Sequence, residues 1–386
     1  MDTLIRNKVS PLTHFFLFGP RGTGKTTWLR MAFPDAVYID LLDPGNFHTF
    51  LSTPQHLESI ADANRTSIII LDEIQRIPGL LPVVHRCIDK QWGKQFILTG
   101  SSARKLRRTN VDMLGGRAAP EHMHPFMAVE MGDRFDLATT LHNGMLPLVY
   151  SAIDPHSILR GYTGIYLEQE IKAEALVRNV ESFARFLTAL SFSQGCILNL
   201  SSIARESQIR RSTITSFLEI AQDLLIVDLL PVFSRRARRT ASVHPKFYYF
   251  DCGVYRSLRP TGALDQPSEI DGVALETLVY QHLRTWIANS QNDIQLSYWH
   301  TLSGMEVDFV LYGTDTFFAF EVKNSTRIRP EDLRGIKAFS DDYPEATCGI
   351  LYRGNERFKT GNTLVIPVSD FLICLDPLKG IADAIE

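Results

Sequence analysis

The sequence predicts an α/β protein in which a doubly wound parallel sheet is followed by a helix-rich region and then by a second, mixed α/β domain. Short apolar runs alternate with helical patterns over residues 1 to about 130, which is typical of parallel strands joined by crossover helices. Long helical patterns begin near residue 154, and strands return after about residue 264. Because 386 residues exceed one typical core, we predict three domains, at 1–153, 154–262 and 263–386.

The first apolar run leads directly into a phosphate-binding loop. Residues 15–30, FFLFGPRGTGKTTWLR, read as a strand, a glycine-containing turn and a helix start. The G-x-x-x-x-G-K-[ST] pattern places backbone N–H groups around phosphate oxygens at a helix N-terminus. We expect Lys25 to contact the β- and γ-phosphates of ATP and the Thr26 hydroxyl to bind Mg²⁺. The residues expected to bind the nucleotide are Gly19, Pro20, Arg21, Gly22, Thr23, Gly24, Lys25, Thr26 and Thr27.

A second strand is expected over 36–42, and an acidic strand follows over 67–73, SIIILDE. Its consecutive apolar residues are typical of a strand buried on both faces of a parallel sheet. Asp72 at its carboxyl end is expected to hold Mg²⁺ through water. Glu73 is expected to orient or deprotonate the attacking water, because hydrolysis needs a proton acceptor in line with the γ-phosphate.

A helix over 80–90 precedes the next apolar strand, QFILT at 95–99, which ends in a glycine and two serines. The polar end of this strand is expected to lie beside the γ-phosphate, with either Thr99 or Ser101 facing the nucleotide. The sequence leaves the choice between these two residues open. Either one extends the predicted nucleotide site to the end of a third strand.

The basic segment at 103–117 offers a residue that acts on a neighbouring copy of the chain. In an oligomer of ATPases, an arginine from one subunit completes the γ-phosphate site of the next. Arg117, after a Gly-Gly pair, is our first choice, and it implies a homo-oligomer. The alternative is a solvated basic helix. The other cations of the segment are Arg104, Lys105, Arg107 and Arg108.

The helix-rich region contains the spacing of a winged helix-turn-helix. Helices are expected over 201–206 and 212–225, and strand-like runs over 226–232 and 246–250 form the wing. Cations at the start of the second helix and in the wing are expected to contact DNA phosphates. The alternative is a protein-docking helical domain with a solvated basic loop. The predicted nucleic-acid residues are Arg210, Arg211, Arg235, Arg236, Arg238 and Arg239.

The last third of the chain places charges inside apolar elements. A helix over 273–286 contains Glu276, and two strand-like runs contain Asp308 and the pair Glu321 and Lys323. Strand periodicity places Glu321 and Lys323 on one face of the strand. Charged side chains on a largely apolar strand are costly to bury unless they are paired or bind an ion.

A metal-dependent phosphodiesterase site is the explanation of these charges that we favour. Asp308 and Glu321 would bind Mg²⁺ or Mn²⁺, Lys323 would position the nucleophile or neutralise phosphate charge, and Glu276 would be an additional ligand. The alternative is an ordinary Glu–Lys pair at a sheet rim beside an unrelated Asp.

Composition limits the possible settings of the protein. The net charge of −3 leaves no global basic field, so a nucleic-acid surface must be local. The five cysteines form no C-x-x-C pair, which favours a reducing, cytoplasmic setting over a zinc ribbon. The N-terminus lacks an apolar signal-peptide core, and no run approaches the roughly 18 apolar residues of a membrane span. We expect a soluble cytoplasmic protein that does not enter a membrane.

Taken in order, these motifs resemble prokaryotic AAA-type ATPases of the archaeal-ATPase-like group that carry a C-terminal domain called DUF4143. The resemblance extends over nearly the whole chain. The matching stretches are GPRGTGKT (19–26), LDEIQRIP (71–78), LTGSS (98–102), GGR (115–117), PKFYYFDCGV (245–254), ALET (274–277), EVDFV (306–310) and FEVKN (320–324).

The resemblance implies an AAA core, a winged helix and a restriction-endonuclease-like domain of the PD-(D/E)xK type. It implies Asp308, Glu321 and Lys323 as a nuclease triad with Glu276 as its helical acid. One stretch departs from the family pattern: the residues after the third strand read TNVDMLGGRAAP, which weakens the assignment of Arg117.

Three functions follow from these observations. The first is a Mg²⁺-dependent, ATP-hydrolysing AAA-type ATPase that acts on DNA and carries a metal-dependent nuclease site. The second is an ATP-driven regulatory switch or DNA-binding protein whose nuclease-like domain is inactive. The third is a non-enzymatic interaction module that binds nucleotide for stability, and Glu73 argues against it.

Overall fold

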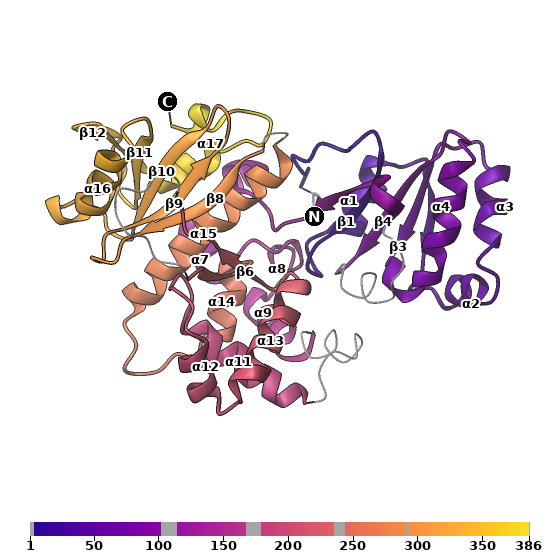
Figure 1. Cartoon of the computed structure of the whole chain (residues 1–386), viewed down its shortest axis with the longest axis horizontal. Helices are drawn as coiled ribbons and strands as arrows, with labels where there is room; N and C mark the ends of the chain where they lie inside the picture. The colour runs from indigo at the N-terminus through magenta and orange to yellow at the C-terminus, as the bar shows by residue number, and fades with distance from the viewer. Residues whose placement is uncertain (1–3, 102–113, 167–178, 235–243, 291–292, 386) are drawn as a thin grey trace. The chain divides into compact units, whose positions relative to one another are not determined.

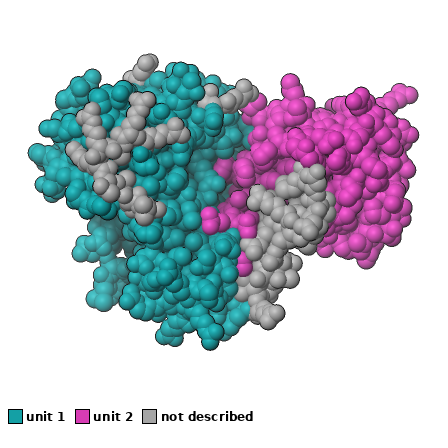
Figure 2. Space-filling model, in the orientation of Figure 1, with its two compact units in different colours: residues 1–8, 125–219, 227–386 teal, residues 9–124, 220–226 magenta. Residues whose placement is uncertain are grey.

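The computed structural model describes residues 4–101, 114–166, 179–234, 244–290 and 293–385 (Figure 1). The chain divides into two compact units (Figure 2). The P-loop unit comprises residues 9–124 and 220–226, and the larger unit comprises residues 1–8, 125–219 and 227–386. The finer division into three domains stays a prediction.

The P-loop unit contains a five-stranded sheet with the order β2-β3-β4-β1-β5, in which every pair of neighbours is parallel. The carboxyl ends of parallel strands meet at one edge, so the phosphate loop after β1 and the acids after β3 share an edge. The predicted parallel sheet is confirmed. Its strands are β1 (His14–Phe18), β2 (Val37–Asp40), β3 (Ile68–Asp72), β4 (Gln95–Gly100) and β5 (Ala118–His122).

Both faces of this sheet are buried. Phe16 and Leu71 belong to one apolar cluster, whereas Phe15 and Ile70 belong to another. Because side chains alternate between the two faces of a strand, apolar residues must follow one another without interruption when both faces are covered. The helices of this unit are α1 (Lys25–Ala32), α2 (Pro44–Ser52), α3 (His56–Ala63) and α4 (Leu81–Asp89).

The helical region of the chain forms two helices and a two-stranded ribbon at the places expected for a helix-turn-helix and wing. These are α12 (Leu200–Ser207), α13 (Arg211–Asp223), β6 (Val227–Leu230) and β7 (Lys246–Tyr249). The winged-helix assignment itself stays a prediction. The neighbouring helices are α6 (Ala128–Met131), α7 (Leu137–Asn143), α8 (Pro147–Tyr150), α9 (Pro155–Gly161), α11 (Val180–Ser191) and α14 (Cys252–Leu258).

The C-terminal part of the larger unit is built on a six-stranded mixed sheet with the order β12-β13-β11-β10-β9-β8. Strands β8, β9 and β10 form an antiparallel ladder that contains the two strand-like runs expected from the sequence, and β11 joins β10 in parallel. The strands are β8 (Gln295–His300), β9 (Glu306–Tyr312), β10 (Phe317–Lys323), β11 (Thr347–Tyr352), β12 (Phe358–Thr360) and β13 (Thr363–Pro367). The helices of this part are α15 (Pro267–Asn289), α16 (Arg334–Asp342) and α17 (Val368–Cys374).

A buried carboxylate joins the end of α7 to the start of α14. Asp251 caps α14: its Oδ1 accepts from the N–H groups of Gly253 at 2.9 Å and Val254 at 3.0 Å, and its Oδ2 accepts from the Met145 N–H at 2.8 Å. Gly144 has φ 72° and leaves no room for a Cβ, which would lie 2.1 Å from Asp251 Oδ1. The contact therefore needs both the acid and the glycine.

Within the described ranges, no helix is both long enough and apolar enough to cross a membrane.

Candidate functional site

Glycines shape the loop between β1 and α1. Gly22 and Gly24 have φ values of 82° and 85°, in the left-handed region that glycine adopts without a steric cost. Gly19 lies so close to the chain that an added Cβ would be 2.4 Å from the Met123 carbonyl oxygen. Helix α1 begins directly after Gly24, so its first N–H groups have no partner within the helix and can bind an anion.

Lys25 lies over the loop that precedes it. Its ammonium donates to the carbonyl oxygens of Gly19 at 2.6 Å and Pro20 at 3.3 Å, and its exposed fraction is 7%. The Thr23 hydroxyl donates to the same Pro20 oxygen at 2.7 Å. An ammonium bonds more strongly to an anionic phosphate oxygen than to a neutral carbonyl. Lys25 is therefore placed to exchange loop carbonyls for phosphate.

Hydroxyl groups surround the Asp72 carboxylate at the end of β3. Thr26 Oγ1 donates to Asp72 Oδ2 at 2.9 Å, and the Tyr38 hydroxyl donates to the same oxygen. The Thr99 hydroxyl donates to Asp72 Oδ1. Asp72 is only 3% exposed. Burial, together with the Asp72 charge, raises the pKa of Tyr38 far above its usual value, so Tyr38 keeps the proton that it donates.

Glu73 has an unusual backbone conformation directly after β3. Its φ of 63° is in the left-handed region, which is uncommon for a residue with a Cβ and is often found at functional sites. Its N–H donates to Thr99 Oγ1 at 3.0 Å. The buried Gln75 amide donates both to Glu73 Oε2 and, at 3.3 Å, to Ser101 Oγ. Thr99 thus bonds Asp72 directly, whereas Ser101 is joined to Glu73 through Gln75.

Sequence reasoning missed Tyr38 and Gln75. Tyr38 pairs with Ile70 in the β2–β3 register, and its hydroxyl reaches the carboxylate two residues farther along β3. A tyrosine inside an apolar strand could have been noticed, but only the strand order places it beside Asp72. Gln75 is nearer in sequence, because it follows Glu73 by two residues in LDEIQRIP.

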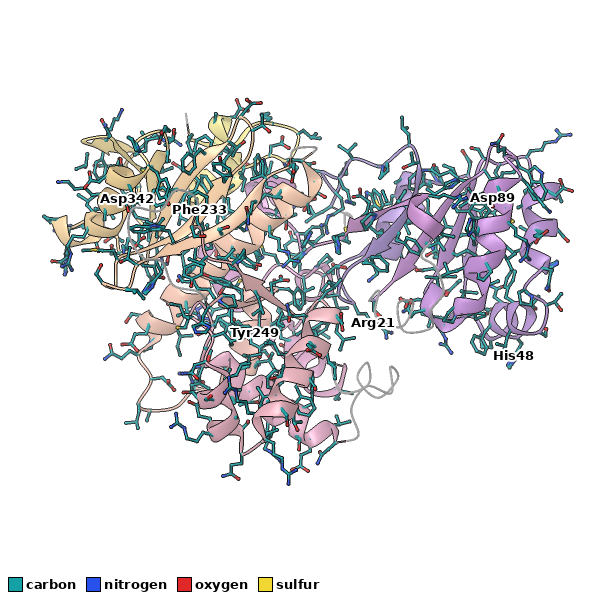
Figure 3. The ribbon with its side chains drawn as sticks, viewed as in Figure 1. Arg21, His48, Asp89, Phe233, Tyr249 and Asp342 are labelled. Carbon is teal, nitrogen blue, oxygen red and sulfur yellow. The ribbon has the colours of Figure 1, made fainter. Side chains whose placement is uncertain are left out.

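Two predicted arginines lie at the surface of the P-loop unit. Arg21 is exposed in the phosphate loop and is labelled in Figure 3. Arg117 Nε lies 3.2 Å from Oδ1 of Asp89 on α4, and the Arg117 side chain is 41% exposed. The role of Arg117 in a neighbouring copy stays a prediction. The other cations considered for that role, Arg104, Lys105, Arg107 and Arg108, lie outside the described residues.

These residues fit a nucleotide with Mg²⁺ by their donor chemistry. The loop and the start of α1 offer N–H groups, Lys25 offers an ammonium, and Thr26 and Asp72 offer two hard oxygen ligands at hydrogen-bonding distance from one another. Glu73 adds a carboxylate at the same sheet edge. The arrangement can bind a polyphosphate and present a proton acceptor beside it.

A second group of charged side chains lies in the larger unit. Asp308 on β9 accepts from the Val322 N–H at 2.8 Å, and Lys323 on β10 donates to Glu321 Oε1 at 2.8 Å. The other carboxylate oxygen of Glu321 is buried and has no hydrogen-bond partner within the described part of the chain. The predicted acids of β9 and β10 therefore share one face of the sheet.

Lys246, which sequence reasoning missed, joins this group from the first position of β7. Its ammonium lies 3.2 Å from Glu276 Oε1 and 3.2 Å from Asp308 Oδ1, and it also contacts Glu306. Its side chain is 2% exposed. The Tyr248 hydroxyl donates to Glu276 as well. We call Lys246, Glu276, Glu306, Asp308, Glu321 and Lys323 the acidic cluster.

Burial and crowding shift the titration of this cluster. Burial raises the pKa of Glu276 to about 7, although Lys246 lowers it in part. Burial, reinforced by the Asp308 charge, raises the pKa of Glu321 to about 8. For Lys246, burial lowers the pKa, but Glu276 and the other nearby groups outweigh it and raise the pKa well above its ordinary value. Lys246 therefore stays charged beside Glu276, whose ionisation burial opposes.

The acidic cluster fits a divalent cation by chemistry, because Mg²⁺ and Mn²⁺ prefer carboxylate oxygens. In the parts of the chain that the structure describes, however, no group of three or more His, Cys, Asp or Glu side chains is arranged to hold a metal ion. Asp308 Oδ1 contacts Lys246 and its Oδ2 accepts from Val322. Both carboxylate oxygens of Asp308 are thus already engaged by protein groups, whereas one oxygen of Glu321 is not.

The predicted nucleic-acid residues divide into two sets. Arg210 and Arg211 are exposed at the start of α13. The remaining four, Arg235, Arg236, Arg238 and Arg239, lie outside the described residues.

Three models of known families match successive parts of the chain. Residues 13–132 match the model of an AAA domain, and residues 271–371 match DUF4143, a domain of unknown function. Residues 134–265 match another domain of unknown function. Uncharacterised proteins of Mycobacterium bovis and Mycobacterium tuberculosis are each 26% identical over 370 residues, which cover 92% of this chain and 80% of theirs.

The AAA match contains the phosphate loop, the acids of β3 and the end of β4, and the DUF4143 match contains Glu276, Asp308, Glu321 and Lys323. The chain therefore carries an ATPase-like AAA domain at its N-terminus and a DUF4143 domain at its C-terminus.

Proposed function

We propose that this protein hydrolyses ATP at the sheet edge that carries the phosphate loop. The observation that carries the proposal is the bond between the Thr26 hydroxyl and the Asp72 carboxylate, at 2.9 Å, beside Lys25 and Glu73. Thr26 and Asp72 would hold Mg²⁺, which would neutralise charge on the β- and γ-phosphates.

Other residues of the chain bind phosphate, accept the proton and orient the carboxylates. Lys25 binds phosphate oxygens in place of the loop carbonyls that it now contacts. Glu73 accepts a proton from the attacking water, and Gln75 positions the Glu73 carboxylate through its amide. Tyr38 and Thr99 orient Asp72. Such positioning is the main contribution that a protein makes to phosphoryl transfer.

Replacing Lys25 by alanine tests this site. We expect ATP affinity to fall by about tenfold or more, because a charge-assisted bond to phosphate is lost. Isothermal titration calorimetry with ATP and Mg²⁺ measures the affinity, and phosphate release measures turnover. Lys359→Ala, an exposed lysine on β12, is the control and should leave both unchanged. Normal turnover by the Lys25 variant would remove the proposal.

The proposal extends to a cytoplasmic homo-oligomer that acts on DNA. Support for DNA comes from the exposed Arg210 and Arg211 at the start of α13, where helix N–H groups also favour phosphate. The four arginines at 235, 236, 238 and 239 would add phosphate contacts. Arg117 would complete the nucleotide site of a neighbouring copy.

A metal-dependent nuclease at the acidic cluster is the second candidate function. It is favoured by the approach of Asp308, Glu321 and Lys323 on neighbouring strands and by the buried, unpartnered oxygen of Glu321. Asp308, Glu321 and Glu276 would hold Mg²⁺ or Mn²⁺, which would activate water and stabilise the leaving oxygen. The alternative is an ATP-driven regulatory switch or DNA-binding protein whose acidic cluster is catalytically inactive.

Cleavage of labelled single- and double-stranded DNA with Mg²⁺ or Mn²⁺, with and without ATP, decides between these two functions. If the cluster is a nuclease, Asp308→Ala should lower cleavage by about 100-fold or more, because a metal ligand is lost. The control is Asp315→Ala, an exposed acid in the turn between β9 and β10. Cleavage that persists in the Asp308 variant does not come from the acidic cluster and removes the nuclease proposal. Absent cleavage beside normal ATP turnover favours the switch.

A further inference from the structure

Lys246 reaches the acidic cluster from outside the sheet that carries most of the acids. It lies on β7, which pairs with β6 in a two-stranded ribbon where Lys246 is opposite Leu230. Asp308 and Glu306 lie on β9 of the six-stranded sheet, and Glu276 lies on α15. The ribbon therefore delivers a cation to acids that belong to other elements.

The contacts of Lys246 are those of a bound cation. One ammonium touches three carboxylates, at 3.2 Å from Glu276, 3.2 Å from Asp308 and in contact with Glu306. The Lys246 side chain is 2% exposed, so water screens its ammonium only weakly. Leaving the buried Asp308 carboxylate without a cation would be strongly unfavourable. The ammonium thus fills the electrostatic role that a divalent ion would otherwise take.

Lys246 also engages the atoms that a metal would need. It contacts Asp308 Oδ1 and Glu276 Oε1, and Tyr248 donates to that same Glu276 oxygen from two residues along β7. Residues two apart on a strand share a face, so β7 presents both groups to the cluster together. A cation and a hydroxyl donor from one strand therefore hold two of the proposed metal ligands.

We propose that Lys246 is the resident cation of the acidic cluster and competes with a divalent metal for Asp308 and Glu276. The inference rests on the proposed metal-binding role of this cluster. Metal binding then requires the Lys246 ammonium to withdraw from these carboxylate oxygens. Lys246 is a positioning residue that sets access to the site.

Binding of Mn²⁺ to the nucleotide-free full chain tests the inference without relying on cleavage. Free Mn²⁺ is measured by electron paramagnetic resonance for the wild type, Lys246→Met and Lys246→Arg. Methionine keeps the apolar bulk of the side chain and removes the charge, whereas arginine keeps the charge. We expect Lys246→Met to bind Mn²⁺ at least ~10-fold more tightly than the wild type and Lys246→Arg, because a buried repelling charge is gone.

Three comparisons make the result specific. Adding Asp308→Asn to Lys246→Met should abolish the gain, which assigns the metal to the acidic cluster. Mn²⁺ should raise the melting temperature of Lys246→Met and not that of the wild type, because a ligand stabilises the state that binds it. Lys337→Met, an exposed lysine on α16, should behave as the wild type.

Tight Mn²⁺ binding by the wild type that Asp308→Asn alone abolishes would overturn the inference. That comparison does not use the methionine variant, so it remains valid even if Lys246→Met does not fold. If Lys246→Met gains Mn²⁺ and no form of the protein cleaves DNA, the nuclease proposal fails and the role of Lys246 stands. If the protein cleaves DNA and the wild type binds Mn²⁺ tightly, the nuclease proposal stands and the proposed role of Lys246 fails.

Discussion

Glu73→Gln is expected to lower the turnover of ATP by about 100-fold or more while the affinity for ATP changes by less than about threefold. The amide cannot accept a proton from the attacking water, so the chemical step slows. Binding survives because Lys25 and the loop N–H groups hold the phosphates. The Gln75 amide can still donate to the new side-chain carbonyl, as it does to Glu73 Oε2.

Phosphate release under saturating ATP and calorimetric titration of ATP measure the two quantities separately. The matched control is Asp62→Asn, which removes a carboxylate from an exposed position on α3. Turnover within about threefold of the wild type would show that Glu73 is not the proton acceptor. A parallel loss of affinity would instead point to a role in binding nucleotide.

Asp251→Ala is expected to lower the free energy of unfolding by about 3 to 5 kcal/mol. The variant leaves three buried N–H groups, those of Met145, Gly253 and Val254, without their acceptor. Each such group costs about 1–3 kcal/mol when it is left unpaired. Urea unfolding followed by tryptophan fluorescence measures the loss.

Asp136, an exposed N-cap residue of α7 that accepts from the Thr139 N–H, is the matched control. Asp136→Ala should cost only about 1 kcal/mol, because water replaces the lost acceptor. Equal losses for the two variants would mean that burial of Asp251 adds nothing to its value as a cap.

The same carboxylate has a pH signature. Burial raises the pKa of Asp251 from 3.8 to about 6, so the folded state holds a proton that the unfolded state releases. The resulting stability is complete below about pH 3.8 and is lost as the pH rises through about 6. Between pH 5 and 7 the wild type should therefore lose about 1 kcal/mol relative to Asp251→Asn, which cannot titrate there.

The nucleotide site could be predicted from the sequence because its chemistry is local. The phosphate loop needs only a few consecutive residues, and the glycines that give it φ values of 82° and 85° are part of the pattern itself. The apolar run at 67–73 likewise predicts a doubly buried strand, which the structure places at Ile68–Asp72. In these stretches, short-range sterics and burial decide the conformation.

The partners of the site residues could not be predicted in this way. Tyr38 reaches Asp72 from 34 residues away because β2 lies beside β3, an order that the periodicity of separate strands does not contain. Gln75 is close in sequence to Glu73, but its bond to Ser101 depends on how β4 lies against β3.

The acidic cluster separates most clearly what the sequence predicts from what the tertiary structure decides. Sequence alone selected Glu276, Asp308, Glu321 and Lys323, because charges inside apolar elements need a compensating partner. It did not select Lys246, which precedes Glu276 by 30 residues and Asp308 by 62. A charged residue inside an apolar stretch indicates that a counter-charge is needed. Which residue supplies it is decided by tertiary packing, because Coulomb attraction depends on distance in space and not on separation along the chain.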